Sequence, residues 1–226
     1  MTKSAATNEV VPMGAETAQM QVWRGEFGRA YTDRNILGLE ELNALWSGNY
    51  GITRREINQA FLQGISKDAS FLEVGCNVGN QLLELHDRGY TNLSGIEIQP
   101  YAVEIAKSRV TGAVIAQGSA LALPYGSDSF DVVFTSGVLI HIAPEDLPQV
   151  MKEIHRCAKT YIWGAEYYSP EVTQVNYRGH DKLLWKMDYA RRYLQSFKDM
   201  ELVREKYLPY LQNQNGESVF LLRKRR

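Results

Sequence analysis

The chain has few of the residues that metal sites, disulfide frameworks and membrane spans require. Its 226 residues include 2 cysteines and 4 histidines, and these do not have the spacing of a metal site. No apolar run approaches the roughly 18 residues of a membrane span, and no targeting segment is recognisable. Cys76 and Cys157 lie in segments that we expect to be buried, which is typical of a reducing compartment. We therefore expect a cytoplasmic protein without a metal ion.

The sequence also lacks an excess of charge of either sign. Lys and Arg number 25, Asp and Glu number 26, and the formal net charge is −1. Such a balance does not produce the broad positive field that attracts nucleic acids or anionic membranes. We expect a small-molecule partner, and neither a nucleic acid nor a membrane. No pattern in the sequence indicates an oligomeric state.

What the sequence does contain is an alternation of short apolar runs with amphipathic helical stretches, which is typical of a doubly wound α/β fold with a mostly parallel sheet. Five strands are expected at 71–74, 92–98, 113–116, 130–135 and 161–165. Helices are expected at 78–88, 100–109, 144–158 and 189–197. The runs 202–208 and 219–222 predict a closing antiparallel pair, which makes seven strands in all.

The segment before the first strand has a different composition. Residues 1–20 mix polar residues with isolated apolar ones, so we expect a flexible N-terminus there. Residues 21–60 are too aromatic for a disordered linker, and we expect them to form a helical lid over the carboxyl edge of the sheet. Residues 61–226 are expected to form a single ligand-binding domain.

A glycine-containing turn follows the first expected strand. The sequence there is Glu73-Val74-Gly75-Cys76-Asn77-Val78-Gly79. Gly75 permits a tight turn with close approach of a ligand, and Gly79 lets the next helix pack against the strand. The backbone N–H groups that start this helix then face the ligand. A plain strand-to-helix connection remains an alternative interpretation.

A carboxylate ends the second expected strand, at Glu97, and Ile98 follows it. A carboxylate at this position can accept hydrogen bonds from both ribose hydroxyls of a nucleoside cofactor. The alternative is a solvated glutamate at the end of a strand.

The first turn indicates which nucleoside is bound. Dinucleotide-binding folds place a second glycine where this chain has Asn77, which reduces the space for a pyrophosphate. Glu73 would repel a phosphate, but it suits the ammonium group of the methionyl part of S-adenosylmethionine. The residues therefore favour S-adenosylmethionine over NAD. An NAD-dependent oxidoreductase and a cofactor-binding protein without turnover remain the alternatives.

These motifs, and others that follow them in order, resemble the class I S-adenosylmethionine-dependent methyltransferases over most of the chain. The further segments are Gln117-Gly118-Ser119-Ala120, Leu123-Pro124-Tyr125, Ser129-Phe130-Asp131-Val132-Val133 and Ser136-Gly137-Val138-Leu139-Ile140-His141-Ile142. The resemblance implies a Rossmann-like sheet, with Ser119 and Ala120 beside the adenine and Cys76 and Ser136 beside the rest of the cofactor. Ser119 replaces a common acidic residue, and its hydroxyl can still bond the adenine amino group.

A narrower resemblance is to the methylases associated with pseudaminic acid biosynthesis. It is carried by Trp23-Arg24-Gly25-Glu26-Phe27-Gly28, Tyr31, Arg34-Asn35, His141-Ile142 with Pro144, Glu166-Tyr167-Tyr168-Ser169-Pro170 and Tyr177-Arg178-Gly179. This resemblance implies a sugar-pathway or specialised-metabolite acceptor that is methylated on O or N. The chain departs from the family pattern at Lys186-Met187-Asp188, where the family has an arginine before the aspartate.

The acceptor is expected above the fourth and fifth strands. Candidate residues there are His141, Glu166, Tyr167, Tyr168, Tyr177, Arg178 and His180. His141 is expected to act as a general base or to hold a backbone group. Glu166 would bind an acceptor amine or orient a neighbour, and Arg178 would bind a carboxylate or phosphate or form a surface ion pair. Arg34 in the lid is expected to reach the cofactor carboxylate. The chain lacks a Gly-x-Ser-x-Gly elbow, a phosphate loop and the Pro-Pro turn of nucleobase methylases.

Overall fold

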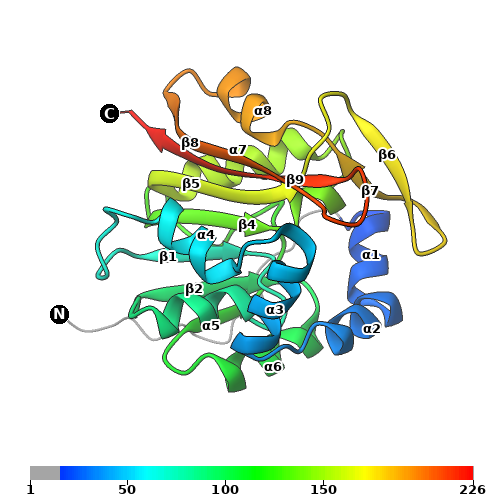
Figure 1. Cartoon of the computed structure of the whole chain (residues 1–226), viewed down its shortest axis with the longest axis horizontal. Coiled ribbons are helices and arrows are strands. Elements are labelled where there is room, and N and C mark those ends of the chain that lie inside the picture. Colours follow the sequence, from blue (N-terminus) through cyan, green and yellow to red (C-terminus); the bar gives the residue numbers. More distant parts are fainter. Residues whose placement is uncertain (1–15, 226) are drawn as a thin grey trace.

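The protein folds as a seven-stranded sheet with helices on both faces (Figure 1). We describe residues 16–225 of a computed structural model. Its helices are α1 (Ala18–Arg24), α2 (Glu26–Arg34), α3 (Leu39–Tyr50), α4 (Arg54–Phe61), α5 (Asn80–Asp87), α6 (Pro100–Arg109), α7 (Leu147–Cys157), α8 (Tyr189–Ser196) and the 3-10 helix η1 (Leu139–His141). The strands are β1 (Phe71–Val74), β2 (Leu93–Glu97), β3 (Val114–Gln117), β4 (Phe130–Ser136), β5 (Ala158–Tyr167), β6 (Thr173–Tyr177), β7 (His180–Lys186), β8 (Met200–Pro209) and β9 (Gly216–Lys224).

The strand order of the large sheet is β3-β2-β1-β4-β5-β9-β8. Strands β1 to β5 are parallel, whereas β9 runs antiparallel to β5 and to β8. This is the class I methyltransferase, Rossmann-like fold, and the expected seven-stranded, mostly parallel sheet is confirmed. The order reverses between β1 and β4, which places a ligand crevice at the carboxyl ends of these strands.

Each face of the sheet buries its own apolar cluster because the central strands are apolar on both sides. Helices α3 to α6 cover one face, where Trp46, Ile57 and Leu82 pack with Phe71 and Phe134 of the sheet. Helices α7 and α8 cover the other face. The two layers hold the carboxyl ends of β1, β2, β4 and β5 at one common edge.

The N-terminal segment is helical, as expected, but it serves two structural roles. The stretch expected to be flexible was residues 1–20. Positions 1–15 lie outside the described residues, and positions 18–20 belong to α1. Only α1 and α2 lie over the carboxyl edge of the sheet (Figure 1). The other half of the expected lid, α3 and α4, contributes to the apolar cluster beneath the sheet. The apolar cluster on this face therefore includes residues on both sides of position 60, where the expected lid ends and the expected ligand-binding domain begins.

A two-stranded hairpin, β6–β7, follows β5 where the sequence analysis expected only a loop. Tyr177 pairs with His180 across a two-residue turn, and both turn residues, Arg178 and Gly179, have positive φ angles of 52° and 83°. Such a turn matches the twist of a hairpin. The mostly exposed residues of β6 carry no apolar run, which is why the sequence pattern did not predict a strand.

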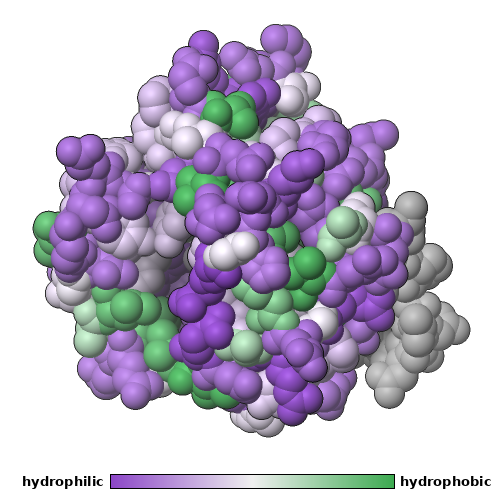
Figure 2. Space-filling view, turned by 90° about the vertical axis from the view of Figure 1, so that its right-hand side faces the viewer, coloured by the Kyte–Doolittle hydropathy of each residue, from purple (hydrophilic) through white to green (hydrophobic). Residues whose placement is uncertain are grey.

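The hairpin and the first two helices together cover the carboxyl edge of the sheet. Phe27 of α2 packs edge-to-face on His180, with ring centroids 4.9 Å apart, and on Tyr177 at 6.1 Å. Gln19 of α1 donates a hydrogen bond to the Lys182 carbonyl. Figure 2 views the molecule from this end, and shows a mainly hydrophilic face with separate hydrophobic patches.

One buried side chain joins this cover to the sheet domain. The Gln99 side-chain amide donates to the carbonyls of Trp23, Arg24 and Gly25 at 3.0–3.1 Å, and its oxygen accepts from the backbone N–H of Tyr101. The end of α1 is thus held by a residue that also caps α6.

We predict that Gln99→Ala releases α1 and α2 while the sheet stays folded, because the variant leaves three carbonyls without their donor. Hydrogen exchange should accelerate at least fivefold over residues 18–34 and change little in β1 and β4. Gln117→Ala, at an exposed position on β3, is the matched control. Unchanged exchange over residues 18–34 would show that Gln99 does not hold these helices.

Candidate functional site

The turn after β1 has the backbone of a ligand-binding turn. Gly75 and Gly79 have φ angles of 74° and 76°, and Asn77 has 45°. A Cβ atom on Gly75 would lie 2.7 Å from a methyl group of Val138, so β4 and this turn approach too closely for a side chain. A Cβ on Gly79 would meet Val110 at 2.8 Å. Gly79 therefore permits the start of α5 to approach the end of α6, while Leu82 of α5 packs against the sheet.

The carboxylate at the end of β2 is fixed beside this turn. Glu97 is buried, with 8% of its surface exposed. It accepts hydrogen bonds from the backbone N–H groups of Asn77 and Gln99, each at 2.8 Å. Burial raises the pKa of Glu97, whereas these N–H groups lower it. The carboxylate is thus oriented before any ligand arrives.

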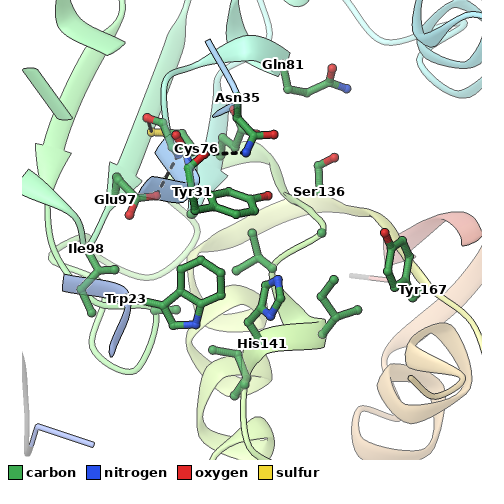
Figure 3. Close-up of a pocket in the computed structure, with 18 of the residues that line it drawn as sticks. Trp23, Tyr31, Asn35, Cys76, Gln81, Glu97, Ile98, Ser136, His141 and Tyr167 are labelled. Atoms are coloured by element: carbon green, nitrogen blue, oxygen red, sulfur yellow. Dashed lines mark hydrogen bonds between the residues drawn. The ribbon is translucent and has the colours of Figure 1, made fainter. Parts of the chain in front are cut away.

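A cavity of about 360 Å³ runs from the end of β2 to the end of β5. Its lining includes ten of the residues expected at the site, namely Glu73, Gly75, Cys76, Asn77, Glu97, Ile98, Ser119, Ala120, Ser136 and His141. Figure 3 shows Glu97 and Ile98 on one side of the Trp23 and Tyr31 rings, and Ser136 and Tyr167 on the other side. The cover thus inserts two aromatic rings into the middle of the site.

Two buried ionisable side chains line the cavity with polar atoms that make no hydrogen bond within the described residues. One oxygen of Glu73 and all three guanidinium nitrogens of Arg54 make no hydrogen bond within the described residues. Arg54 is 1% exposed, and its guanidinium lies 4.3 Å from the ring centroid of Trp46 and 5.4 Å from that of Trp163. Burial lowers the pKa of Arg54 to about 10 and raises the pKa of Glu73 well above its usual range.

His141 lies at the end of η1, where the chain turns after β4. Its Nδ1 is 2.7 Å from the Leu183 carbonyl of β7, and since a carbonyl only accepts, Nδ1 carries the proton. Nε2 is then the acceptor nitrogen of the ring. The ring packs against Trp23 at 4.5 Å and Tyr177 at 5.2 Å. Burial lowers the pKa of His141 to about 4, so the imidazole is neutral at pH 7.

Glu166 does not line the cavity, although we expected it to contact the acceptor. The side chain is buried beside the turn that follows β4. Its carboxylate accepts hydrogen bonds from the backbone N–H groups of Val138 at 3.2 Å and Ile140 at 3.4 Å. Burial raises the pKa of Glu166 to about 7. Glu166 therefore holds the turn that carries His141, which was the orienting alternative.

Three other expected site residues also lie away from the cavity. Arg34 is exposed on α2, and Arg178 is exposed at the tip of the hairpin, 5.9 Å from the ring of Tyr177. Tyr168 packs on Tyr207 of β8, with ring centroids 5.4 Å apart. Because strand residues alternate between faces, its neighbour Tyr167 faces the cavity instead.

Three residues that were not expected at the site also line the cavity, namely Tyr50, Arg54 and Glu217. The segment Thr53 to Glu56 has the capping-box pattern of a helix start, and that box is present. A cation in the first turn of a helix is unfavourable because it opposes the helix dipole. The position of Arg54 therefore indicated a role other than stabilising this helix. Glu217 lies on β9, where no local pattern marks it as part of the site.

The residues present fit S-adenosylmethionine. Gly75 leaves a cradle that a Cβ would fill, and Glu97 is prearranged to accept hydrogen bonds from ribose hydroxyls. Ser119, Ala120 and Ile98 also line the cavity, where the adenine would lie. At the other end, the unpartnered Glu73 and Arg54 match an ammonium and a carboxylate.

Residues 72–161 match the family model for a methyltransferase domain. The matched segment begins inside β1 and includes β2, the Gly75 turn and Glu97, as well as His141. Matches to known proteins extend the comparison beyond this segment.

The chain is 34% identical over 95 residues to an uncharacterised methyltransferase of Synechocystis, covering 42% of this chain and 44% of that protein. It is 25% identical over 170 residues to a sterol 4-C-methyltransferase of Caenorhabditis elegans, covering 69% of this chain and 49% of that protein. The chain thus spans less than half of the length of these curated relatives.

A solved structure shares the fold over nearly the whole chain. It is the 1,6-didemethyltoxoflavin-N1-methyltransferase of Burkholderia thailandensis, with bound 1,6-didemethyltoxoflavin and S-adenosylhomocysteine. The TM-score is 0.68 at 16% identity, covering 97% of this chain and 94% of that one. Among the described residues of the present chain, no helix is long and apolar enough to cross a membrane.

We predict that His141 makes the fold sensitive to acid. The folded state holds the His141 pKa near 4, whereas the ordinary value is 6.5, so between these values the unfolded chain binds more protons. Stability is therefore lost as the pH falls. Between pH 7 and 4.5, the free energy of unfolding should drop by about 2 kcal/mol more in the wild type than in His141→Gln. His86→Gln, at an exposed position, is the control. Identical pH profiles for all three proteins would contradict the burial of a neutral His141.

Proposed function

We propose that the protein is an S-adenosylmethionine-dependent methyltransferase that acts on a small polar metabolite. The observation that carries this proposal is the pairing of the Gly75 turn with Glu97. These lie on adjacent parallel strands, next to the reversal of the strand order, inside a segment that matches a methyltransferase domain. This is where open α/β sheets bind nucleoside cofactors.

Glu73 and Arg54 would hold the methionyl part of the cofactor. Arg54 is attracted by Glu217 and by Glu73, but Arg54 and Glu73 form no hydrogen bond with each other within the described residues. An ammonium beside Glu73 and a carboxylate beside Arg54 would satisfy both groups. Arg54 thus takes the role that we expected of Arg34.

When bound, S-adenosylmethionine supplies an electrophilic methyl group on its sulfonium. The chain contributes positioning and exclusion of water, because proximity alone can supply about 7 kcal/mol or more. Helices α1 and α2 and the β6–β7 hairpin cover the edge of the sheet, which suits a closing lid. Glu166 keeps η1 in place below this cover.

His141 would contribute through its free Nε2, which can accept a hydrogen bond from an acceptor group. With a pKa near 4 the ring stays neutral at pH 7, but it is a weaker base than an ordinary histidine. We therefore propose that His141 orients the acceptor, and that its proton-accepting role is secondary.

The acceptor is proposed to be a sugar-pathway or specialised metabolite. The narrower resemblance to the pseudaminic acid-associated methylases supports this class. A structurally similar protein is named as a methyltransferase of 1,6-didemethyltoxoflavin and has that compound bound. The balanced charge of the chain also suits a small-molecule partner in the cytoplasm.

An NAD-dependent oxidoreductase is the weaker alternative because Asn77 and the buried Glu73 stand where a pyrophosphate would lie. Calorimetry distinguishes the two. We expect S-adenosylhomocysteine to bind and NAD not to bind. Glu97→Ala should weaken S-adenosylhomocysteine by about 1–3 kcal/mol, roughly 5- to 150-fold, through loss of charged hydrogen bonds. Binding of NAD alone would overturn the proposed function.

We predict that Arg54 recognises the cofactor carboxylate. Arg54→Gln should weaken S-adenosylhomocysteine at least tenfold, yet leave 5′-methylthioadenosine, which lacks the amino-acid part, within twofold. Arg55→Gln is the control, since Arg55 is a neighbour that pairs with Asp87. Equal losses for both ligands would assign Arg54 a structural role, and unchanged affinity for both would remove it from the cofactor site.

A further inference from the structure

A cluster of tyrosines and one carboxylate lines the end of the cavity beyond Arg54. Tyr50 of α3 donates a hydrogen bond of 2.5 Å to Glu217 of β9, and Tyr210 donates to the hydroxyl of Tyr167 at 3.0 Å. The Tyr50 and Tyr210 rings lie 4.7 Å apart, and the Tyr167 and Tyr210 rings lie 6.0 Å apart. We call these four residues the Tyr–Glu cluster.

The Tyr–Glu cluster lies where an acceptor is expected. Tyr167 ends β5 and pairs in register with Glu217 at the start of β9. The cluster thus adjoins the carboxyl edge beside β4, away from Glu97 and the adenine end. Figure 3 shows Tyr167 across the site from Glu97.

The charged residues around the cavity indicate whether the acceptor is positively or negatively charged. Among the described lining residues, Arg54 is the only Lys or Arg, while Glu73, Glu97, Asp146 and Glu217 carry carboxyl groups. In the proposed function, Arg54 pairs with the methionyl carboxylate and Glu73 with the ammonium of the cofactor. Glu217 also attracts Arg54, but once Arg54 pairs with the cofactor carboxylate, Glu217 is left to face the acceptor. Arg178, the expected anchor for a carboxylate or phosphate, lies outside the cavity.

The aromatic rings of the cluster also favour a positively charged acceptor. Tyrosine faces attract cations when an ammonium lies within about 6 Å of the ring centroid. The ammonium of Lys186, which donates to Asn215, already lies 5.8 Å from the Tyr167 ring centroid, although Lys186 does not line the cavity. A carboxylate next to aromatic rings is a suitable environment for a second ammonium.

We propose that the Tyr–Glu cluster binds the ammonium group of the methyl acceptor, so that the reaction is the N-methylation of an amine. This inference rests on the proposed function, and it names the substrate class for the same site. An anionic acceptor would be repelled by the Glu217 carboxylate.

The chemical step assigns a second task to Glu217. A protonated amine has no free electron pair, so one N–H proton first passes to the Glu217 carboxylate. The nitrogen lone pair then forms the N–C bond to the methyl carbon, while the S–C bond breaks and its electron pair stays on sulfur. The product is a methylated ammonium. Burial raises the pKa of Glu217, which supports its acceptance of a proton.

The test uses the full chain saturated with S-adenosylhomocysteine and a pair of probes with the same shape. Choline carries a quaternary ammonium, and 3,3-dimethylbutan-1-ol has carbon in its place. Calorimetric or NMR titration should show that choline binds at least tenfold more tightly than the alcohol. Glu217→Gln should remove this difference, because the amide keeps an acceptor for Tyr50 but loses the charge. Glu171→Gln, at an exposed position outside the cavity, should retain it.

Equal or weaker binding of choline relative to the alcohol, no choline binding at all, or a preference that survives in Glu217→Gln would each overturn the ammonium site. In all of these cases intact binding of S-adenosylhomocysteine would leave the proposed function standing. Failure of S-adenosylhomocysteine itself to bind the wild type would count against the proposed function. The Glu217→Gln protein should bind S-adenosylhomocysteine within threefold of wild type, which confirms that it is folded.

Discussion

The buried guanidinium of Arg54 is the constraint around which the site is organised. A charge without hydrogen-bond partners in the interior costs several kcal/mol, and Arg54 is 1% exposed with three unpartnered nitrogens. The faces of Trp46 and Trp163 and the carboxylates of Glu217 and Glu73 offset part of this cost. The three nitrogens still lack hydrogen-bond acceptors within the described residues, and we propose that a ligand carboxylate supplies them.

The fold supplies the other half of this arrangement. The reversal of the strand order between β1 and β4 opens a crevice, and Gly75 allows the two strands to approach closely. Buried carboxylates at Glu73 and Glu97 then face the same cavity as Arg54. The ammonium and the carboxylate of the cofactor would complement Glu73 and Arg54, and its ribose hydroxyls would complement Glu97. Helices α1 and α2 cover the edge and restrict water, which strengthens each of these interactions.

The strands, the turn after β1 and the carboxylate at Glu97 were predictable because each is encoded by neighbouring residues. The site residues that were missed depend on contacts across the chain, since Tyr50 and Glu217 are 167 positions apart. Arg34 and Arg178 lie outside the cavity, and a sequence motif does not reveal whether a side chain points inward. Glu166 lies near the end of β5, as the sequence predicted. The backbone N–H groups that donate to its carboxylate come close to it only when the turn after β4 folds, so these contacts could not be predicted.

A crystal structure with S-adenosylhomocysteine tests the central claim most directly. The account predicts that the ligand carboxylate lies within hydrogen-bond distance of Arg54, that its ammonium lies beside Glu73 and that both ribose hydroxyls contact Glu97. The methyl position should then face the cavity end formed by Tyr50, Tyr167, Tyr210 and Glu217. A ligand carboxylate bound elsewhere, with Arg54 still unpartnered, would contradict the account.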